Sequence, residues 1–173
     1  MATAPGPSRS TRWTVSRLAR AVHRAGAPQP SPAPDRTAQL TALAVVLADA
    51  SAEQPLADWA VAACGEAGPV PAAVAQTAGR QAARYSQLAG RLRALPADGE
   101  VAALRERALR LVAYHQWMLR QCANLAFTTH PDERTEEARR RINGLGAPGN
   151  RLRELHEQVR AEAARALEET ARF

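Results

Sequence analysis

Lysine is absent from this chain of 173 residues, so all 23 basic side chains are arginines. Without lysine the chain cannot form a lysine Schiff base. It also lacks the lysine of a phosphate-binding loop and of a kinase-type ATP site. A composition that is rich in Ala and Arg and free of Lys is also typical of a GC-rich coding genome. The abundance of arginine is therefore weak evidence for a binding site by itself.

Aromatic residues are scarce at 4%, and isoleucine occurs once, at Ile142. Strands are usually built from β-branched and aromatic residues, whereas Ala, Leu, Arg and Glu favour helices. Hydrophobic residues still make up 46% of the chain, which is enough for a core. The composition predicts an all-α protein, and the length suits one domain with a short appendage.

Cysteine is also rare, with only Cys64 and Cys122, which are far apart in sequence and have no metal-ligand spacing. We expect two isolated, buried thiols in a reducing compartment rather than a disulfide. No run of about 18 apolar residues is present, and the N-terminus lacks the apolar segment of a secretory signal. These features predict a cytoplasmic protein, with an organellar transit peptide as the alternative interpretation of the first residues.

An arm and one helical domain are expected from the distribution of charge and proline. Residues 1–34 contain five arginines and no acidic residue. We interpret them as a basic, partly disordered arm with one short amphipathic helix, at 11–25, and a proline-rich spacer. Residues 35–173 form the predicted helical domain. Its first part, 35–70, is acidic, with one arginine and five acids.

Apolar residues at helical spacing and the positions of Gly and Pro divide 35–173 into helices. We predict an antiparallel helical bundle with four main helices plus short accessory helices, because short connections favour antiparallel neighbours. Asp35 is the expected N-cap of the first helix. A break at 51–54 separates this helix from a short one that begins at Pro55, and a second short helix, highly charged, ends at Ile142. The main helices are expected at 36–50, 71–95, 100–127 and 150–171.

The periodicity also predicts which side chains face the core. The expected inward residues are Leu40, Leu43, Val46 and Leu47 on the first main helix, and Val74, Ala78, Gln81, Tyr85, Leu88, Leu92 and Leu95 on the second. They are Leu104, Ala108, Leu111, His115, Met118, Cys122 and Leu125 on the third, and Leu152, Leu155, Val159, Ala163, Ala166 and Leu167 on the last.

The segment 144–149 reads Gly-Leu-Gly-Ala-Pro-Gly and matches the G-x-G-x-x-G pattern of dinucleotide-binding loops. That pattern requires a preceding strand and a βαβ unit, whereas a charged helical segment precedes it here. We therefore predict a plain loop between helices and no cofactor. A weaker hypothesis places an anion at a helix N-terminus near Asn150, assisted by Arg151 and Arg153.

Two histidines, His115 and His156, are expected on inward-facing or edge positions of the bundle. Di-metal bundles require several inward glutamates and Glu-x-x-His motifs, and no such motif occurs in this sequence. We expect hydrogen-bonded core histidines and assign no catalytic or metal-binding residue. The sequence thus favours a protein without enzymatic activity over an enzyme. An enzyme with a pocket between helices near His115 is a remote alternative.

Two aromatic residues, Tyr114 and Trp117, lie away from the apolar stripe of the third main helix, with Arg110 and Gln121 beside them. A large apolar ring there needs a second cover. We expect that cover to come from the arm or another helix of this chain, with a partner protein as the alternative. The leading functional hypothesis is a helical-bundle adaptor or accessory protein that presents this face to a protein partner or a second copy.

The alternative function is association with nucleic acid through non-specific phosphate contacts. Its candidate residues in the acid-free arm are Arg12, Arg17, Arg20 and Arg24. They are joined by Arg80, Arg84 and Arg91, which with Gln87 form a separate face of the second main helix at helical spacing. The plainer interpretation of the helical arginines is a solvated face or pairing with acids of the last helix. Small residues on the same helix predict close helix packing or a dimer seam; they are Ala75, Gly79, Ala82, Ala83, Ser86 and Gly90.

Overall fold

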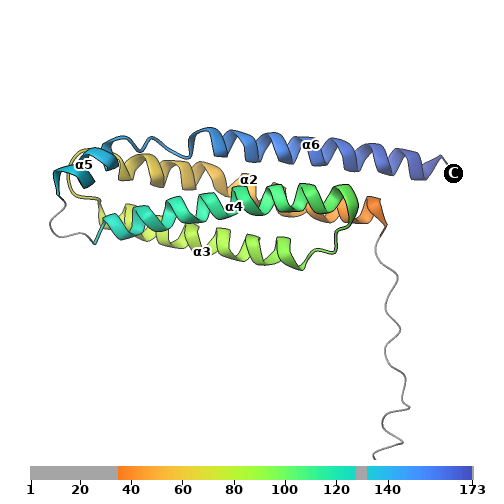
Figure 1. Cartoon of the computed structure of the whole chain (residues 1–173), viewed down its shortest axis with the longest axis horizontal. Helices are drawn as coiled ribbons and strands as arrows, with labels where there is room; N and C mark the ends of the chain where they lie inside the picture. The colour runs from red at the N-terminus through yellow and green to blue at the C-terminus, as the bar shows by residue number, and fades with distance from the viewer. Residues whose placement is uncertain (1–34, 128–131, 173) are drawn as a thin grey trace, which may run out of the picture. The chain divides into compact units, whose positions relative to one another are not determined.

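A computed structural model describes residues 35–127 and 132–172 of the chain (Figure 1). These ranges contain five helices and no strand: α2 (Arg36–Cys64), α3 (Ala72–Ala94), α4 (Gly99–Leu125), α5 (Glu133–Arg140) and α6 (Gly146–Ala171). The predicted all-α bundle with four long helices is confirmed. The amphipathic helix and the spacer predicted within 1–34 lie outside the described residues.

The four long helices pack side by side around a central pair, α2 and α4. Each of these two contacts the other three long helices, while α3 and α6 flank the pair on opposite sides (Figure 1). None of the helices in the described ranges is long and apolar enough to cross a bilayer. The central position of α2 and α4 means that each has one side against the core and one side facing outward.

Helix α2 begins where the sequence predicts and continues further than predicted. The Asp35 carboxylate accepts a hydrogen bond from the backbone N–H of Ala38 at 2.7 Å, which confirms the N-cap. The predicted break at 51–54 is wrong, because α2 runs through Pro55 without interruption. Proline removes one backbone donor from a helix. Buried residues on both sides of it, such as Ala50 and Ala57, keep the chain helical across that position.

The start of α6 also differs from the prediction. The helix begins at Gly146 rather than near 150, so most of the 144–149 segment belongs to its first turn. Pro148 is tolerated there because the N–H groups of a first helical turn have no intrahelical acceptor. Gly144 and Gly146 have positive φ angles of 68° and 59°, which turn the chain into the helix. The segment is a helix start, and no strand precedes it in the described residues.

The predicted core is largely correct. The inward residues of α2 and α3 are buried, except that Leu95 is only partly so. On α4 the centre of the buried side is rotated toward Val112 and Leu119, which leaves four predicted core residues only partly buried: Leu104, Leu111, Met118 and Leu125. On α6 the prediction for Leu167 is wrong, since it is 53% exposed. At 100° per residue it lies about 80° from Val159, which is at the centre of the buried side.

Candidate functional site

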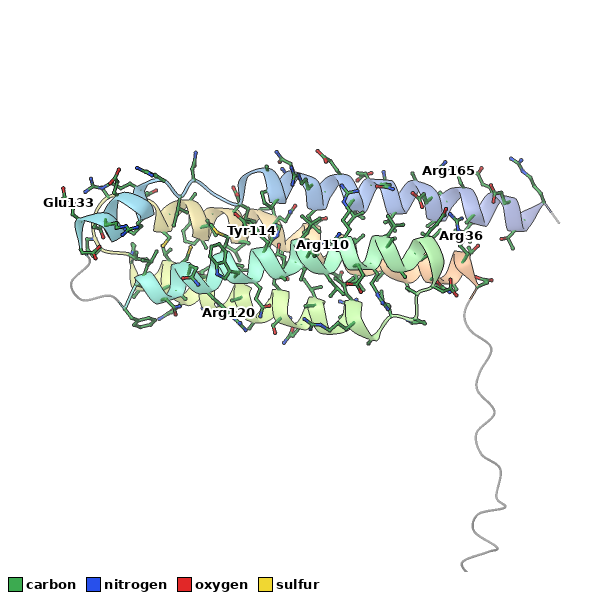
Figure 2. All side chains as sticks on the ribbon, viewed as in Figure 1. Arg36, Arg110, Tyr114, Arg120, Glu133 and Arg165 are labelled. Carbon is green, nitrogen blue, oxygen red and sulfur yellow. The ribbon has the colours of Figure 1, made fainter. Side chains whose placement is uncertain are left out.

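The side chains of Arg110, Tyr114, Trp117 and Gln121 share one exposed face of α4, which we call the α4 aromatic face. Their spacing of four, three and four residues places them in line along the helix. Tyr114 and Trp117 are 36% and 54% exposed, and their ring centroids are 6.0 Å apart. Figure 2 shows Arg110 and Tyr114 along the same stretch of α4. The structure thus brings together all four residues that the sequence suggested for a partner face.

No described helix covers Trp117. The expectation that another helix of the chain packs on it is therefore wrong for residues 35–127 and 132–172. The reason is the arrangement of the bundle: α2, α3 and α6 all pack against the core side and flanks of α4. The other cover that the sequence suggested, the arm, lies outside the described residues.

The opposite side of α4 holds a fully buried polar ring, His115. Its Nδ1–H donates to the Leu111 carbonyl at 2.6 Å, and its Nε2 accepts from the Gln54 side-chain amide at 3.3 Å. The same amide donates to the Gly149 carbonyl at 2.8 Å. Burial lowers the pKa of His115, opposed by the hydrogen bond to Leu111 and the charge of Asp58. His115 is therefore a neutral, hydrogen-bonded core histidine that joins α4 to α2 and, through Gln54, to α6.

Two tyrosines enclose this histidine. Tyr85 of α3 stacks on the His115 ring with centroids 5.1 Å apart, and its hydroxyl donates to the Ala50 carbonyl at 3.1 Å. Burial and the nearby Glu53 carboxylate raise the pKa of Tyr85. Tyr114 meets His115 edge-on, with centroids 6.2 Å apart. Since Tyr114 also contacts Trp117, it connects the buried ring to the exposed face.

The two cysteines meet at the α5 end of the bundle. Both are free and fully buried, as expected, and the Cys64 thiol lies 3.7 Å from the Cys122 carbonyl oxygen. The Cys122 thiol, as a side-chain hydrogen-bond partner, and the charge of Arg139 lower the pKa of Cys64, and burial opposes them. The guanidinium of Arg139 is itself buried and pairs with Glu136 at 2.6 Å. The two thiols, far apart in sequence, lie close together because the fold brings the ends of α2 and α4 together.

Comparisons with protein-family models, with curated protein sequences and with solved structures find no match for this chain. Any functional proposal therefore rests on the geometry of the chain itself.

The α3 arginines share their surface with acidic residues of α2. Arg91 pairs with Asp49 at 2.5 Å, and Arg84 lines a cavity together with Asp49 and Glu53. The sequence suggested that these arginines pair with acids of the last helix. This is wrong, because the acids near them belong to α2. Arg80 donates to Thr77 at 3.1 Å. This surface has mixed charge, and the arm arginines Arg12, Arg17, Arg20 and Arg24 lie outside the described residues.

Only part of the small-residue side of α3 packs closely. Ala75 and Ala82 are mostly buried, whereas Gly79, Ala83 and Ser86 line an open groove with residues of α4. A Cβ atom added at Gly79 would meet nothing within 4 Å. Exposed small residues without an occupant do not define a binding site.

The start of α6 is already supplied with a negative charge by the chain. The Asp58 carboxylate accepts a hydrogen bond from the backbone N–H of Leu145 at 2.7 Å, just before the first turn of α6. A carboxylate at a helix N-terminus is favoured by the helix dipole. An external anion assisted by Arg151 and Arg153 would have to approach Asp58. The described residues also contain no cluster of His, Cys, Asp or Glu arranged to hold a metal.

A second exposed apolar surface lies on α2 and was missed by sequence reasoning. Val45, Leu56 and Trp59 are 53%, 48% and 49% exposed. Gln54 of α2 contacts His115 of α4 on the inner side, so the outer sides of these two helices point in opposite directions. The sequence does contain a signal for this α2 surface, which is a repeat of apolar residues at three- and four-residue spacing. The predicted break at 51–54 divided that repeat into two pieces.

Proposed function

We propose that this chain is a non-enzymatic helical-bundle adaptor that presents the α4 aromatic face to a protein partner or a second copy. The observation that carries the proposal is the exposed ring pair Tyr114 and Trp117 on a helix whose other side is fully packed.

The composition of this face supports a protein-binding role. Tyr, Trp and Arg are enriched at the centres of protein interfaces, where a few large side chains supply most of the binding energy. Trp117 is the largest ring on the face, and Arg110 and Gln121 provide polar groups at its edge. An aromatic residue that is half exposed on a rigid helix can bind without a large cost in ordering.

The position of Tyr114 adds to this argument. Its ring packs edge-on against His115, and that histidine is held by Leu111 and Gln54. Tyr114 is therefore supported from below by a hydrogen-bonded core. A partner that contacts Trp117 meets a pair in which the Tyr114 ring already packs against the core, which favours affinity through preorganisation.

Affinity capture of the full chain, from cells that produce this protein, tests the proposal. We expect at least one protein, which can be a second tagged copy, to be retained by the wild type and lost with Trp117→Ala. Leu167→Ala is the matched control, because Leu167 is as exposed as Trp117 but lies on α6. A capture profile that is unchanged by Trp117→Ala would overturn the proposal, whatever the oligomeric state of the chain.

Association with nucleic acid is a second proposal, and it rests on the five arginines and absence of acids in residues 1–34. Anisotropy titrations of mixed-sequence duplex DNA at two salt concentrations test it with the full chain. Binding that weakens steeply with salt, and that is lost when Arg12, Arg17, Arg20 and Arg24 are changed to Gln, would support it. No binding, or binding insensitive to salt, would remove it.

A further inference from the structure

Helix α2 is apolar on two opposite sides. Its inner side, including Leu40, Leu47 and Val61, is fully buried in the bundle. Its outer side carries a second row of apolar residues, which we call the α2 outer stripe: Val45, Ala48, Ala52, Leu56 and Trp59. Helices that are hydrophobic all round are normally buried on all sides. No helix in the described residues covers the outer stripe, and its three largest side chains, Val45, Leu56 and Trp59, are about half exposed.

We propose that the α2 outer stripe is the surface through which two copies of this chain associate, with their α2 helices antiparallel and centred on Ala52. The spacing of the stripe carries this assignment. Val45 and Trp59 lie seven residues before and after Ala52, and Ala48 and Leu56 lie four residues before and after it. Under a two-fold axis through Ala52 these positions lie opposite one another, so the stripe of one copy meets the stripe of the other along its whole length.

The side-chain sizes along the stripe are complementary under this two-fold axis. Trp59 of one copy lies opposite Val45 of the other copy, and Leu56 lies opposite Ala48. Each large side chain therefore faces a smaller one, at both ends of the contact. The small residues Ala48 and Ala52 near the centre allow the helix axes to approach to about 8 Å, the close end of the usual range.

The charges around the stripe are also compatible with a second copy. The stripe itself contains no charged residue, so its burial leaves no unpaired charge. On the side toward α3 it is bordered by Asp49 and Arg91, which are about half exposed as a pair, and by Arg84. The two-fold axis brings this border against the same border of the other copy. Because it carries both signs, arginines of one copy can approach acids of the other without net repulsion.

The size of the contact predicts a modest affinity. The stripe from Val45 to Trp59 covers about 21 Å of helix at 1.5 Å per residue. A single helix pair of this length lies near the lower limit for a specific interface, so we expect a dissociation constant in the micromolar range. The α4 aromatic faces would remain open on both copies, since they point away from α2. The inference is thus independent of the function proposed for α4.

Disulfide trapping of the full chain tests the register of the pair. In an Ala52→Cys variant the two introduced thiols meet at the two-fold axis, and we expect a covalent dimer under mild oxidation with oxidised glutathione. Thr41→Cys is the matched control, also exposed and on α2. In an antiparallel pair its two thiols are about 33 Å apart, so no link forms. The native cysteines are fully buried and do not compete.

Three other outcomes of the trapping experiment would overturn the proposal. Equal linkage at positions 41 and 52 would indicate a parallel pair, and linkage at 41 alone would indicate a different register. Absence of linkage at 52 would mean that no second copy occupies this part of the stripe.

Sedimentation velocity of the full chain measures the affinity without a cross-link. We expect a concentration-dependent dimer whose dissociation constant rises at least tenfold with Trp59→Ala, while Trp117→Ala leaves it unchanged. A monomer at all concentrations up to about 200 μM, well above the expected micromolar range, would overturn the proposal. So would a dimer that is lost with Trp117→Ala but not with Trp59→Ala. That last result would support the α4 aromatic face as the contact between copies.

Discussion

Two rings on opposite sides of α4 depart from the usual distribution of polar and apolar groups. His115 is fully buried, whereas Trp117, two residues later, is about half exposed. Both ring nitrogens of His115 have partners, in Leu111 and Gln54, and its ring stacks on Tyr85. Trp117 pairs with the Tyr114 ring and remains 54% exposed. The comparison teaches that helix phase and available hydrogen-bond partners, rather than hydrophobicity, decide which of these rings is buried.

The largest effect is expected from removing the ring on which His115 stacks. Tyr85→Ala empties a fully buried site and should lower the free energy of unfolding by about 3–5 kcal/mol. Tyr85→Phe keeps the stacking and loses only the hydrogen bond to the Ala50 carbonyl, at a cost of about 1 kcal/mol. Urea unfolding followed by circular dichroism measures both values. Equal losses for the two variants would show that the hydroxyl, not the ring, supports the histidine.

A smaller but specific loss is expected when the amide partner of His115 is removed. Gln54→Ala leaves the buried Nε2 atom of His115 without its donor and should cost about 1–3 kcal/mol. Gln121→Ala is the matched variant on the exposed side of α4, where a change within about 0.5 kcal/mol is expected. The difference in urea midpoint between the two variants measures the contrast between the two sides of the bundle. Similar midpoints would contradict the hydrogen-bonded interior.

Acid should destabilise the protein through His115. Burial lowers its pKa in the folded state below the ordinary value of 6.5, so the unfolded chain binds the proton more readily. The contribution is fully present above pH 6.5 and is lost as the pH falls toward the folded pKa, at no more than about 1.4 kcal/mol per pH unit for one proton. Unfolding free energies measured from pH 7.5 to 5 in the wild type and His115→Gln test this. A slope that persists in the variant would assign the acid sensitivity to other groups.

The smallest effect on stability is expected at the exposed ring. Trp117→Ala removes a side chain that is about half exposed and not part of the core, so the free energy of unfolding should change by no more than about 0.5 kcal/mol. Thermal unfolding of the variant, compared with Leu119→Ala two residues away on the buried side, measures this. Leu119→Ala should cost about 2–5 kcal/mol because it creates a cavity. A large loss with Trp117→Ala would mean that the ring is covered in the folded chain.

The sequence predicts the individual helices well where caps and periodicity agree. The Asp35 carboxylate caps α2 as expected, and α3 and α4 end within about two residues of the prediction. The α4 aromatic face could also be predicted, because four residues on one helix share a face through local geometry alone. The phase of α4 placed His115 correctly in the core despite its polarity.

The predictions that failed involve competition between a local signal and burial. The predicted break at 51–54, with a new helix beginning at Pro55, does not occur, because the residues on both sides of Pro55 are packed into the core. One lost backbone hydrogen bond is small compared with the apolar burial on either side. The α2 outer stripe was missed for the same reason, since it is visible only when α2 is one continuous helix.

By itself the sequence determined the helical class, most helix boundaries and the residues that share each helix face, since these follow from periodicity and capping along one segment. Only the tertiary structure decided which faces meet. The contact between Gln54 and His115 joins residues 61 positions apart, that between Gln54 and Gly149 spans 95, and that between Cys64 and Cys122 spans 58. Such contacts depend on the neighbours and rotation of each helix in the bundle. The arrangement of the helices is the one that minimises exposed apolar area and unpaired polar groups over the whole chain. No single segment of the sequence contains enough information to specify that arrangement.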